Sequence, residues 1–157
     1  MSVTIQQQDF ELAAELADLR SSGRGAGALV SFVGLVRDFA GVQKIDSLYL
    51  QHYPGMSEKA LQKIATQAQA RWNLLGVRVI HRVGVLEADE QIVMVATAAS
   101  HRAEAFSACE FIIDYLKTDA PFWKREQTVR GAHWLETRSA DSLRTARWNC
   151  AMAGEQS

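Results

Sequence analysis

Lysines and aromatic residues occur together in the segment from Asp114 to Glu126, which reads DYLKTDAPFWKRE. Lys117 and Lys124 stand on either side of Pro121, and three aromatic residues lie near them in the sequence. Burial beside aromatic rings disfavours the ammonium form of a lysine. Such a lysine can serve as a nucleophile, as a proton donor or as a fixed charge for an anion. The same pattern also fits two solvated lysines, one at a helix end and one on a strand.

A second group with possible chemistry stands where an apolar strand is expected to end and a helix to begin. Ser100, His101 and Arg102 follow one another there. A helix N-terminus offers free N–H groups and a partial positive charge, so an imidazole and a guanidinium beside it suit a phosphate or a carboxylate. An ordinary serine cap followed by two exposed residues gives the same pattern. Arg37, at the end of another apolar run, is either a binding residue or a surface residue before a turn.

Several familiar catalytic patterns are missing from the sequence. It contains no Gly-rich phosphate loop, no Gly-x-Ser-x-Gly elbow and no His-Glu-x-x-His motif. These absences argue against the common nucleotide hydrolases, serine hydrolases and zinc peptidases. The histidines are scattered without an i, i+4 pair and the two cysteines have no metal or redox spacing, so metal binding has little support.

Length and charge bound the kind of protein. The 157 residues predict one domain, residues 1–148, followed by a flexible tail, residues 149–157. Seventeen Lys and Arg against 18 Asp and Glu give a formal net charge of -1, whereas nucleic-acid-binding domains are usually far more basic. The sequence has neither a secretory signal nor a membrane-spanning run of about 20 apolar residues. We therefore expect a cytoplasmic protein with reduced Cys109 and Cys150.

The elements that must position these residues are both helical and extended. Asp9, Ser57 and Ser100 are expected to cap three helices, and a fourth helix is expected from near Ser139 to Trp148. Apolar and β-branched runs predict strands over residues 28–36, 45–51, 77–83, 91–99, 122–129 and 133–137. Because helices and strands mix without strict βαβ alternation, the sequence favours an α+β fold over a doubly wound parallel sheet.

In combination, the motifs resemble those of one family, the large, catalytic subunits of molybdopterin synthase. The run DYLK followed by APFWKRE is the most specific, and its position downstream of SHR leaves little room for chance. The segments that carry the resemblance lie in family order, from about residue 28 to about residue 148. They are GLVR at 34–37, HYPGM at 52–56, HRVG at 81–84, SHR at 100–102, DYLK at 114–117, APFWKRE at 120–126 and WLETR at 134–138.

The resemblance implies a sulfurtransferase of molybdenum cofactor biosynthesis. Its fold would be an α/β hammerhead with an additional small antiparallel β-sheet. Members of the family transfer two sulfur atoms to cyclic pyranopterin monophosphate and so form the dithiolene of molybdopterin. The sulfur arrives as a thiocarboxylate on the C-terminal Gly-Gly of a small ubiquitin-like partner subunit. The large subunit forms a homodimer within a heterotetramer, and the reaction needs no metal and no organic cofactor.

The resemblance also implies roles for individual residues. Lys117 and Lys124 match the two active-site lysines of the family, and we expect them to stabilise charge or move protons. We expect His101 and Arg102 to grip the cyclic phosphate. A substrate-binding role is implied for Arg37, His101, Arg102, Lys117, Lys124, Arg125 and Glu126. Glu126 would orient a lysine, and Arg37 could act in the pocket of a neighbouring protomer.

Some positions depart from the family pattern, and some alternatives stay open. Leu35 replaces a frequent basic residue, Gln51 replaces a frequent glutamate, and the stretch with Val85 and Asp89 lacks a turn glycine. The alternatives are a non-catalytic interaction subunit, a different phosphate-ligand enzyme and an RNA-binding module. The retained basic residues argue against a non-catalytic subunit. The missing phosphate loop and the missing acidic metal site argue against a different phosphate-ligand enzyme. The neutral net charge argues against the third.

Overall fold

The computed structural model describes residues 1–40, 43–128, 131–135 and 139–152. Its elements are β1 (Ser2–Gln6), α1 (Leu12–Ser22), β2 (Ala28–Leu35), β3 (Phe39–Ala40), β4 (Gln43–His52), α2 (Met56–Trp72), β5 (Gly76–Arg82), β6 (Gly84–Glu87), β7 (Gln91–Ala99), α3 (Arg102–Asp119), β8 (Phe122–Thr128), β9 (Gly131–Leu135) and α4 (Ser139–Met152). Helices and strands mix as predicted, and the α+β fold class is confirmed.

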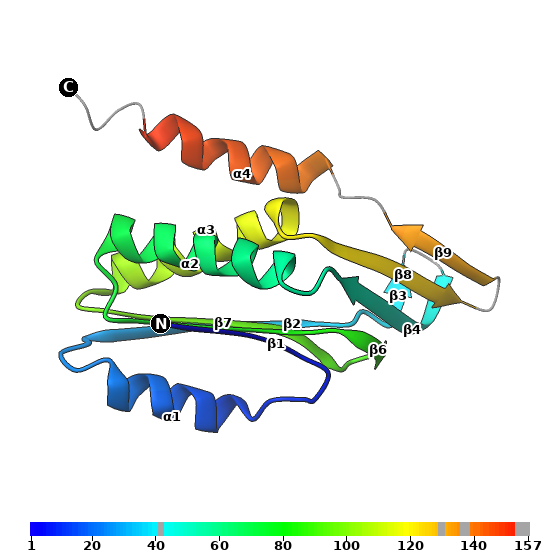
Figure 1. Cartoon of the computed structure of the whole chain (residues 1–157), viewed down its shortest axis with the longest axis horizontal. Helices are drawn as coiled ribbons and strands as arrows, with labels where there is room; N and C mark the ends of the chain where they lie inside the picture. The colour runs from blue at the N-terminus through cyan, green and yellow to red at the C-terminus, as the bar shows by residue number, and fades with distance from the viewer. Residues whose placement is uncertain (41–42, 129–130, 136–138, 153–157) are drawn as a thin grey trace.

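The larger sheet has the strand order β1-β5-β7-β2. β1 and β5 are parallel, whereas β7 is antiparallel to both of its neighbours. The helices α2 and α3 cover one face of this sheet and α1 covers the other (Figure 1). Because both faces are covered, β5 and β7 are buried almost throughout. The sequence of β7 is a near-continuous apolar run, whereas β5 also contains Arg78, His81 and Arg82.

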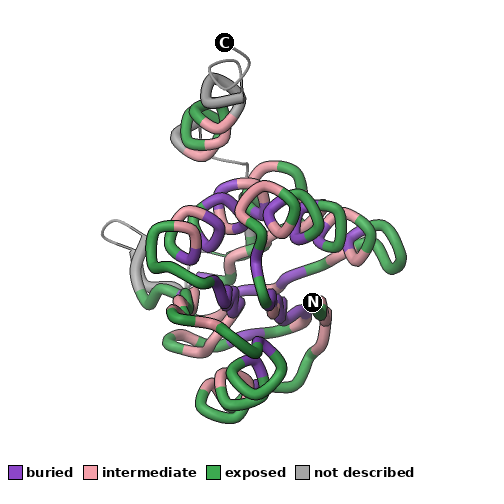
Figure 2. Tube along the Cα trace, turned by 90° about the vertical axis from the view of Figure 1, so that its left-hand side faces the viewer, coloured by how far each residue is buried: buried purple, intermediate pink, exposed green. Residues whose placement is uncertain are grey.

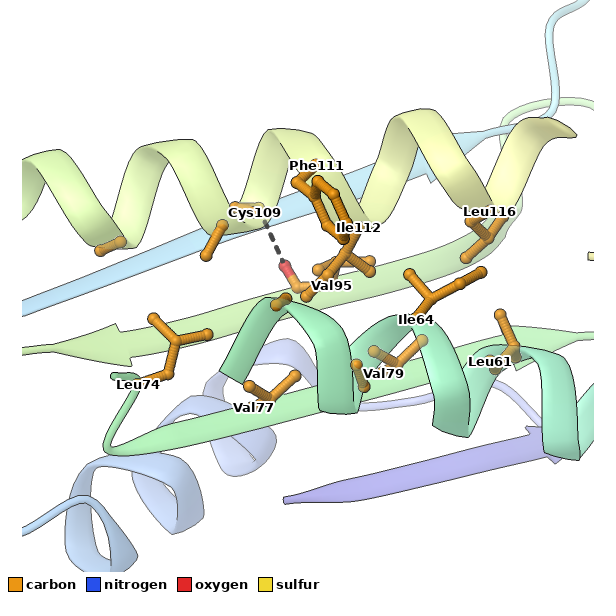
Figure 3. Packing of buried hydrophobic residues seen from close by; sticks show 14 of the residues in the cluster. Leu61, Ile64, Leu74, Val77, Val79, Val95, Cys109, Phe111, Ile112 and Leu116 are labelled. Carbon is orange, nitrogen blue, oxygen red and sulfur yellow. Dashed lines mark hydrogen bonds between the residues drawn. The ribbon is translucent and has the colours of Figure 1, made fainter. Parts of the chain in front are cut away.

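The main core lies between this sheet and the helices α2 and α3 (Figure 3). Alternate residues of β7 point to opposite faces, so Val95 joins this core and Met94 packs toward α1. The Cys109 thiol donates a hydrogen bond to the Val95 carbonyl oxygen at 3.7 Å. Burial raises the pKa of Cys109 to about 12, which makes this thiol a core group rather than a nucleophile.

The smaller sheet is antiparallel, as the family resemblance implies. Its order is β3-β4-β8-β9. β6 pairs with residues 47–50 of β4, on the edge of β4 opposite β8. It lies beyond one end of the larger sheet, near the C-terminal end of α3 (Figure 1). Figure 2 shows that the described residues of α4 are largely exposed. Buried residues are concentrated in the sheets and on the inner faces of α2 and α3.

The three predicted helix caps are wrong. The residues before the first turns are instead Glu11, Gly55 and His101. Asp9 accepts a hydrogen bond from the Phe10 backbone N–H at 2.9 Å, before the helix begins. Ser57 is buried, and its hydroxyl donates to the Pro121 carbonyl oxygen at 3.1 Å. Ser100 lies one residue too early, since α3 begins after His101. A tertiary contact therefore decides what the Ser57 side chain does.

The predicted strands and the fourth helix occur, and all but one of them have shifted ends. The strand over residues 91–99 is found with those bounds, and α4 continues to Met152, into the segment expected as a tail. Residues 153–157, Val129 at the end of one predicted strand and residues 136–137 at the end of the last one lie outside the described residues. The strands β1, β3 and β6 were not predicted. No helix in the described ranges is long and apolar enough to cross a membrane.

Candidate active site

A cavity of about 420 Å³ lies where the two sheets meet, near the C-terminal end of α3. Its walls come from both sheets and from the helices α3 and α4. Four predicted site residues line it, from three separate segments: Arg37, Lys117, Lys124 and Glu126. The structure therefore gathers side chains that are up to 89 positions apart in the sequence.

The alternation of β8 decides which of its residues reach the cavity. Lys124 and Glu126 line it together with Phe122, because residues two apart on a strand share a face. Arg125 points to the opposite face, where its guanidinium lies 5.1 Å from the Tyr49 ring and 5.6 Å from the Trp134 ring. The structure thus does not bring Arg125 to the cavity with the two lysines.

A bulge at the end of β2 delivers Arg37. The pairing of β2 with β7 shifts register between Gly34 and Leu35, which redirects the strand. A side chain at Gly34 would place its Cβ 2.8 Å from a methyl group of Val93, so only glycine fits this close approach. Val36 is then buried, and Arg37 follows it as an exposed residue at the cavity rim.

The end of α3 delivers Lys117. Leu116 is buried in the core, and Lys117, the next residue, is exposed and lines the cavity. It lies in the last turn of the helix, where a cation is favoured by the partial negative charge of the helix end. Pro121 follows two residues after Asp119, the last residue of α3, and directs the chain into β8. The turn between helix and strand therefore fixes both lysines at one cavity.

His101 and Arg102 lie at the other end of α3. Both are exposed, and neither lines the cavity. Arg102 and Lys117 are roughly 22 Å apart along the helix axis, at about 1.5 Å per residue. Within one chain, the structure does not bring these two predicted phosphate-binding residues to the lysines.

Sequence reasoning missed His81 as a cavity residue. Its side chain lines the cavity and is 2% exposed, and its ring stacks on Phe122 with centroids 3.8 Å apart and planes 8° apart. Its Nδ1 lies 2.8 Å from the Arg82 carbonyl oxygen. Burial, with smaller contributions from the charges of Lys124 and His52, lowers the pKa of His81 to about 4. The signal in the sequence was a histidine directly after the apolar pair Val79 and Ile80 in a predicted strand.

The charges of the cavity suit an anionic ligand. Arg37, Lys117 and Lys124 face two carboxylates, those of Glu126 and Asp141, at its wall. Cations held in place by separate elements can bind a phosphate and stabilise negative charge that develops in a reaction. In the part of the chain that the structure describes, no three His, Cys, Asp or Glu side chains gather as metal ligands would.

Known proteins share this sequence and fold. The model of the family described as MoaE protein matches residues 5–119. The molybdopterin synthase catalytic subunit of Ralstonia nicotianae is 51% identical over 147 residues, which are 94% of this chain and 84% of that protein. The corresponding subunit of Pseudomonas aeruginosa is 49% identical over 148 residues, covering 94% and 99%.

Solved structures agree with these matches. The molybdopterin biosynthesis MoaE protein from Burkholderia ambifaria superposes with a TM-score of 0.80 at 52% identity, over 94% of this chain and 98% of that one. Molybdopterin synthase from Staphylococcus aureus gives a TM-score of 0.77 at 27% identity, over 84% and 95%. Since the family model covers most of the chain and the relatives are about half identical to nearly all of it, the chain belongs to the MoaE family of molybdopterin synthase catalytic subunits.

Proposed function

We propose that the cavity between the two sheets is the site at which this catalytic subunit transfers sulfur to cyclic pyranopterin monophosphate. The observation that carries the proposal is the meeting of Arg37, Lys117 and Lys124, from three segments, at one cavity. A cyclic phosphate needs such cations, and so does a reaction in which oxygen atoms take up negative charge.

The sulfur donor would be the C-terminal thiocarboxylate of a small ubiquitin-like partner subunit. Its sulfur attacks a side-chain carbon of the pterin and forms a carbon–sulfur bond, while the departing oxygen takes up a proton. Water then cleaves the acyl–sulfur bond, which leaves sulfur on the substrate and a carboxylate on the partner. A second loaded partner repeats the transfer and completes the dithiolene.

The free Cys109 thiol fits a reducing cytoplasm, which we propose as the location of the reaction.

Lys117 and Lys124 are the groups we assign to charge and proton transfer. Lys117 reaches the cavity from a helix end and Lys124 from the neighbouring strand, so a reacting group between them would meet cations from two directions. Glu126 shares the cavity-facing side of β8 with Lys124 and would orient a lysine or accept a proton.

A second copy of the chain can bring His101 and Arg102 to this site. β2 is an edge strand of the larger sheet and has exposed apolar side chains at Leu29, Phe32 and Leu35. An unpaired edge of this kind is suited to pairing with another strand, and a two-fold axis is the commonest way to pair identical surfaces.

The register of β2 indicates which residues of the two copies such pairing would bring together. Ala28 lies opposite Ala99, next to the start of α3, and Leu35 lies at the other end, next to Arg37. Antiparallel pairing of two β2 strands about their midpoint would put residue 28 of one copy beside residue 35 of the other. The α3 start of the second copy, with His101 and Arg102, would then approach Arg37 of the first. We propose that each active site is built in this way from two copies.

The test is a sulfur-transfer assay with a thiocarboxylated small subunit and cyclic pyranopterin monophosphate, with dithiolene as the measured product. We expect Lys117→Ala and Lys124→Ala each to lose at least about 100-fold in turnover while they still bind the small subunit. Lys63→Ala, an exposed lysine on α2, is the matched control and should keep wild-type activity. Wild-type turnover in both cavity variants would overturn the proposal.

A further inference from the structure

We propose that His81 orients the substrate, by accepting a hydrogen bond at Nε2 from an N–H or O–H group of the bound pterin. The inference rests on the proposed function of the cavity and adds a residue to it. His81 comes from the end of β5, a different element from those that supply the cations, and lines the same cavity.

The position of the ring is fixed on two sides. Its plane is held by the stack on Phe122, with centroids 3.8 Å apart, and His52 lies against the same phenyl ring with centroids 6.4 Å apart. Its Nδ1 lies 2.8 Å from the Arg82 carbonyl oxygen. A carbonyl oxygen only accepts, so Nδ1 carries the hydrogen and donates it. In the neutral ring, Nε2 is then a lone-pair acceptor of known direction.

The surroundings keep the ring neutral. His81 is 2% exposed, and burial lowers its pKa to about 4, with the positive charge of Lys124 acting in the same direction. The charged and titratable groups at the cavity and beside the stack come from five other segments. They are Arg37 after β2, His52 on β4, Lys117 on α3, Lys124 and Glu126 on β8, and Asp141 on α4.

A neutral acceptor has a specific use among these cations. The phosphate of the substrate offers only acceptors and pairs with lysine and arginine, but it gains nothing from Nε2 of His81. The opposite holds for an N–H or O–H group of the pterin. The two kinds of group therefore favour a single orientation of the substrate, with the phosphate toward the cations and a donor toward His81.

Nε2 of His81 is open to the cavity. Among the described residues it receives no hydrogen bond, yet the buried side-chain atoms that lack a partner are His52 Nδ1 and Glu104 Oε2, so Nε2 is not one of them. A donor group of a ligand in the cavity can therefore reach this nitrogen.

Two substitutions separate the nitrogens. His81→Asn keeps a donor near Nδ1 for the Arg82 carbonyl but has no acceptor at the position of Nε2, whereas His81→Gln keeps an acceptor near Nε2. We expect His81→Asn to lower kcat/KM about 10- to 100-fold, mainly through KM, and His81→Gln to recover most of the loss. His52→Asn is the control, because His52 also stacks on Phe122 but lies outside the cavity, and this variant should leave kcat/KM unchanged.

A second measurement does not depend on how the variants fold. The 15N signals of His81 would be recorded in the wild-type protein without the small subunit, so that no sulfur is transferred, before and after addition of cyclic pyranopterin monophosphate. We expect the Nε2 signal to move in the direction of an accepted hydrogen bond. An unmoved signal, or wild-type kcat/KM in His81→Asn, would overturn the role of His81. If Lys117→Ala and Lys124→Ala were both fully active, the proposed function itself would fail.

Discussion

The carboxylate of Asp114 accepts a hydrogen bond from the indole Nε1 of Trp148 at 2.8 Å, and this contact ties α4 to α3. Asp114 is only 4% exposed, yet its oxygens also accept from Arg144 at 3.0 Å and from Arg147 at 3.0 Å. A buried carboxylate with this many donors is fully satisfied. Because Asp114 lies one turn before Lys117, the same helix segment holds both α4 and a proposed catalytic lysine.

Replacing this carboxylate should loosen α4. Asp114→Asn keeps the size of the side chain but loses the charge and part of the accepting capacity, so we expect the free energy of unfolding to fall by about 1–3 kcal/mol. Urea denaturation followed by tryptophan fluorescence measures the change. Glu110→Gln is the control, since Glu110 pairs with the same two arginines but is 44% exposed, and it should cost less than about 1 kcal/mol. Equal losses in the two variants would contradict the special role of Asp114.

The strands and helices that the sequence predicts are those with a strong pattern of their own. β7 is apolar except for Gln91 and Thr97, and its bounds match the prediction. β1 was missed because SVTIQ is short and half polar, and its extended form depends on pairing with β5. The helix caps were wrong for a related reason. Ser57 bonds to Pro121, a residue 64 positions away, which no local pattern could indicate.

The candidate site shows the same limit. The motifs identified Arg37, Lys117 and Lys124, and the structure brings these three together at one cavity. His81 was missed because its role depends on burial and on a ring that β8 places against it. His101 does not line the cavity of its own chain. A motif names the residues of a site but not the copy of the chain that supplies each of them, and we propose that a second copy supplies His101.

Mixed dimers test the proposal that the site is shared between copies. Arg37→Ala and Arg102→Ala should each be inactive alone, because each removes a group from every site. In a mixed dimer, one of the two sites has both native residues. After exchange of subunits, we therefore expect about a quarter of the wild-type turnover to return.

The control for this experiment mixes Arg37→Ala with Lys117→Ala. Both residues line the cavity of a single chain, so every site in the mixed dimer lacks one of them and no activity should return. If the Arg37→Ala and Arg102→Ala mixture also stayed inactive, with exchange shown by mass spectrometry, the shared site would be ruled out.

A turn at which the family usually has glycine offers a stability test. Asp89, between β6 and β7, has a φ of +67°, a conformation that costs an L-residue energy. Its N–H still donates to the Val36 carbonyl at 2.9 Å, just before Arg37. We expect Asp89→Gly to raise the free energy of unfolding by about 0.5–1 kcal/mol, measured by urea denaturation. Asp89→Ala keeps the backbone strain and should bring no gain. A gain of the same size in Asp89→Ala would show that the carboxylate, and not the backbone, carries the cost.

The buried His81 predicts how stability depends on pH. Its pKa is about 4 in the folded protein, below the ordinary value of 6.5, so the unfolded chain takes up a proton first as the pH falls. The contribution of His81 is therefore complete above about pH 6.5 and is lost between about pH 6.5 and 4, at a cost of about 3 kcal/mol in total.

Urea denaturation at intervals from pH 7 to pH 5 measures this loss. His81→Gln cannot titrate, so its free energy of unfolding should fall much less over the same range. Above pH 5, the change in the free energy of unfolding reports on the histidine and not on Glu15. Glu15, whose pKa is lowered by a hydrogen bond from Arg78, loses its stabilising effect only as the pH falls below its ordinary value of 4.5. Parallel pH profiles for the wild type and His81→Gln would show that His81 is not held neutral by burial, and would also remove the basis for its role as an acceptor.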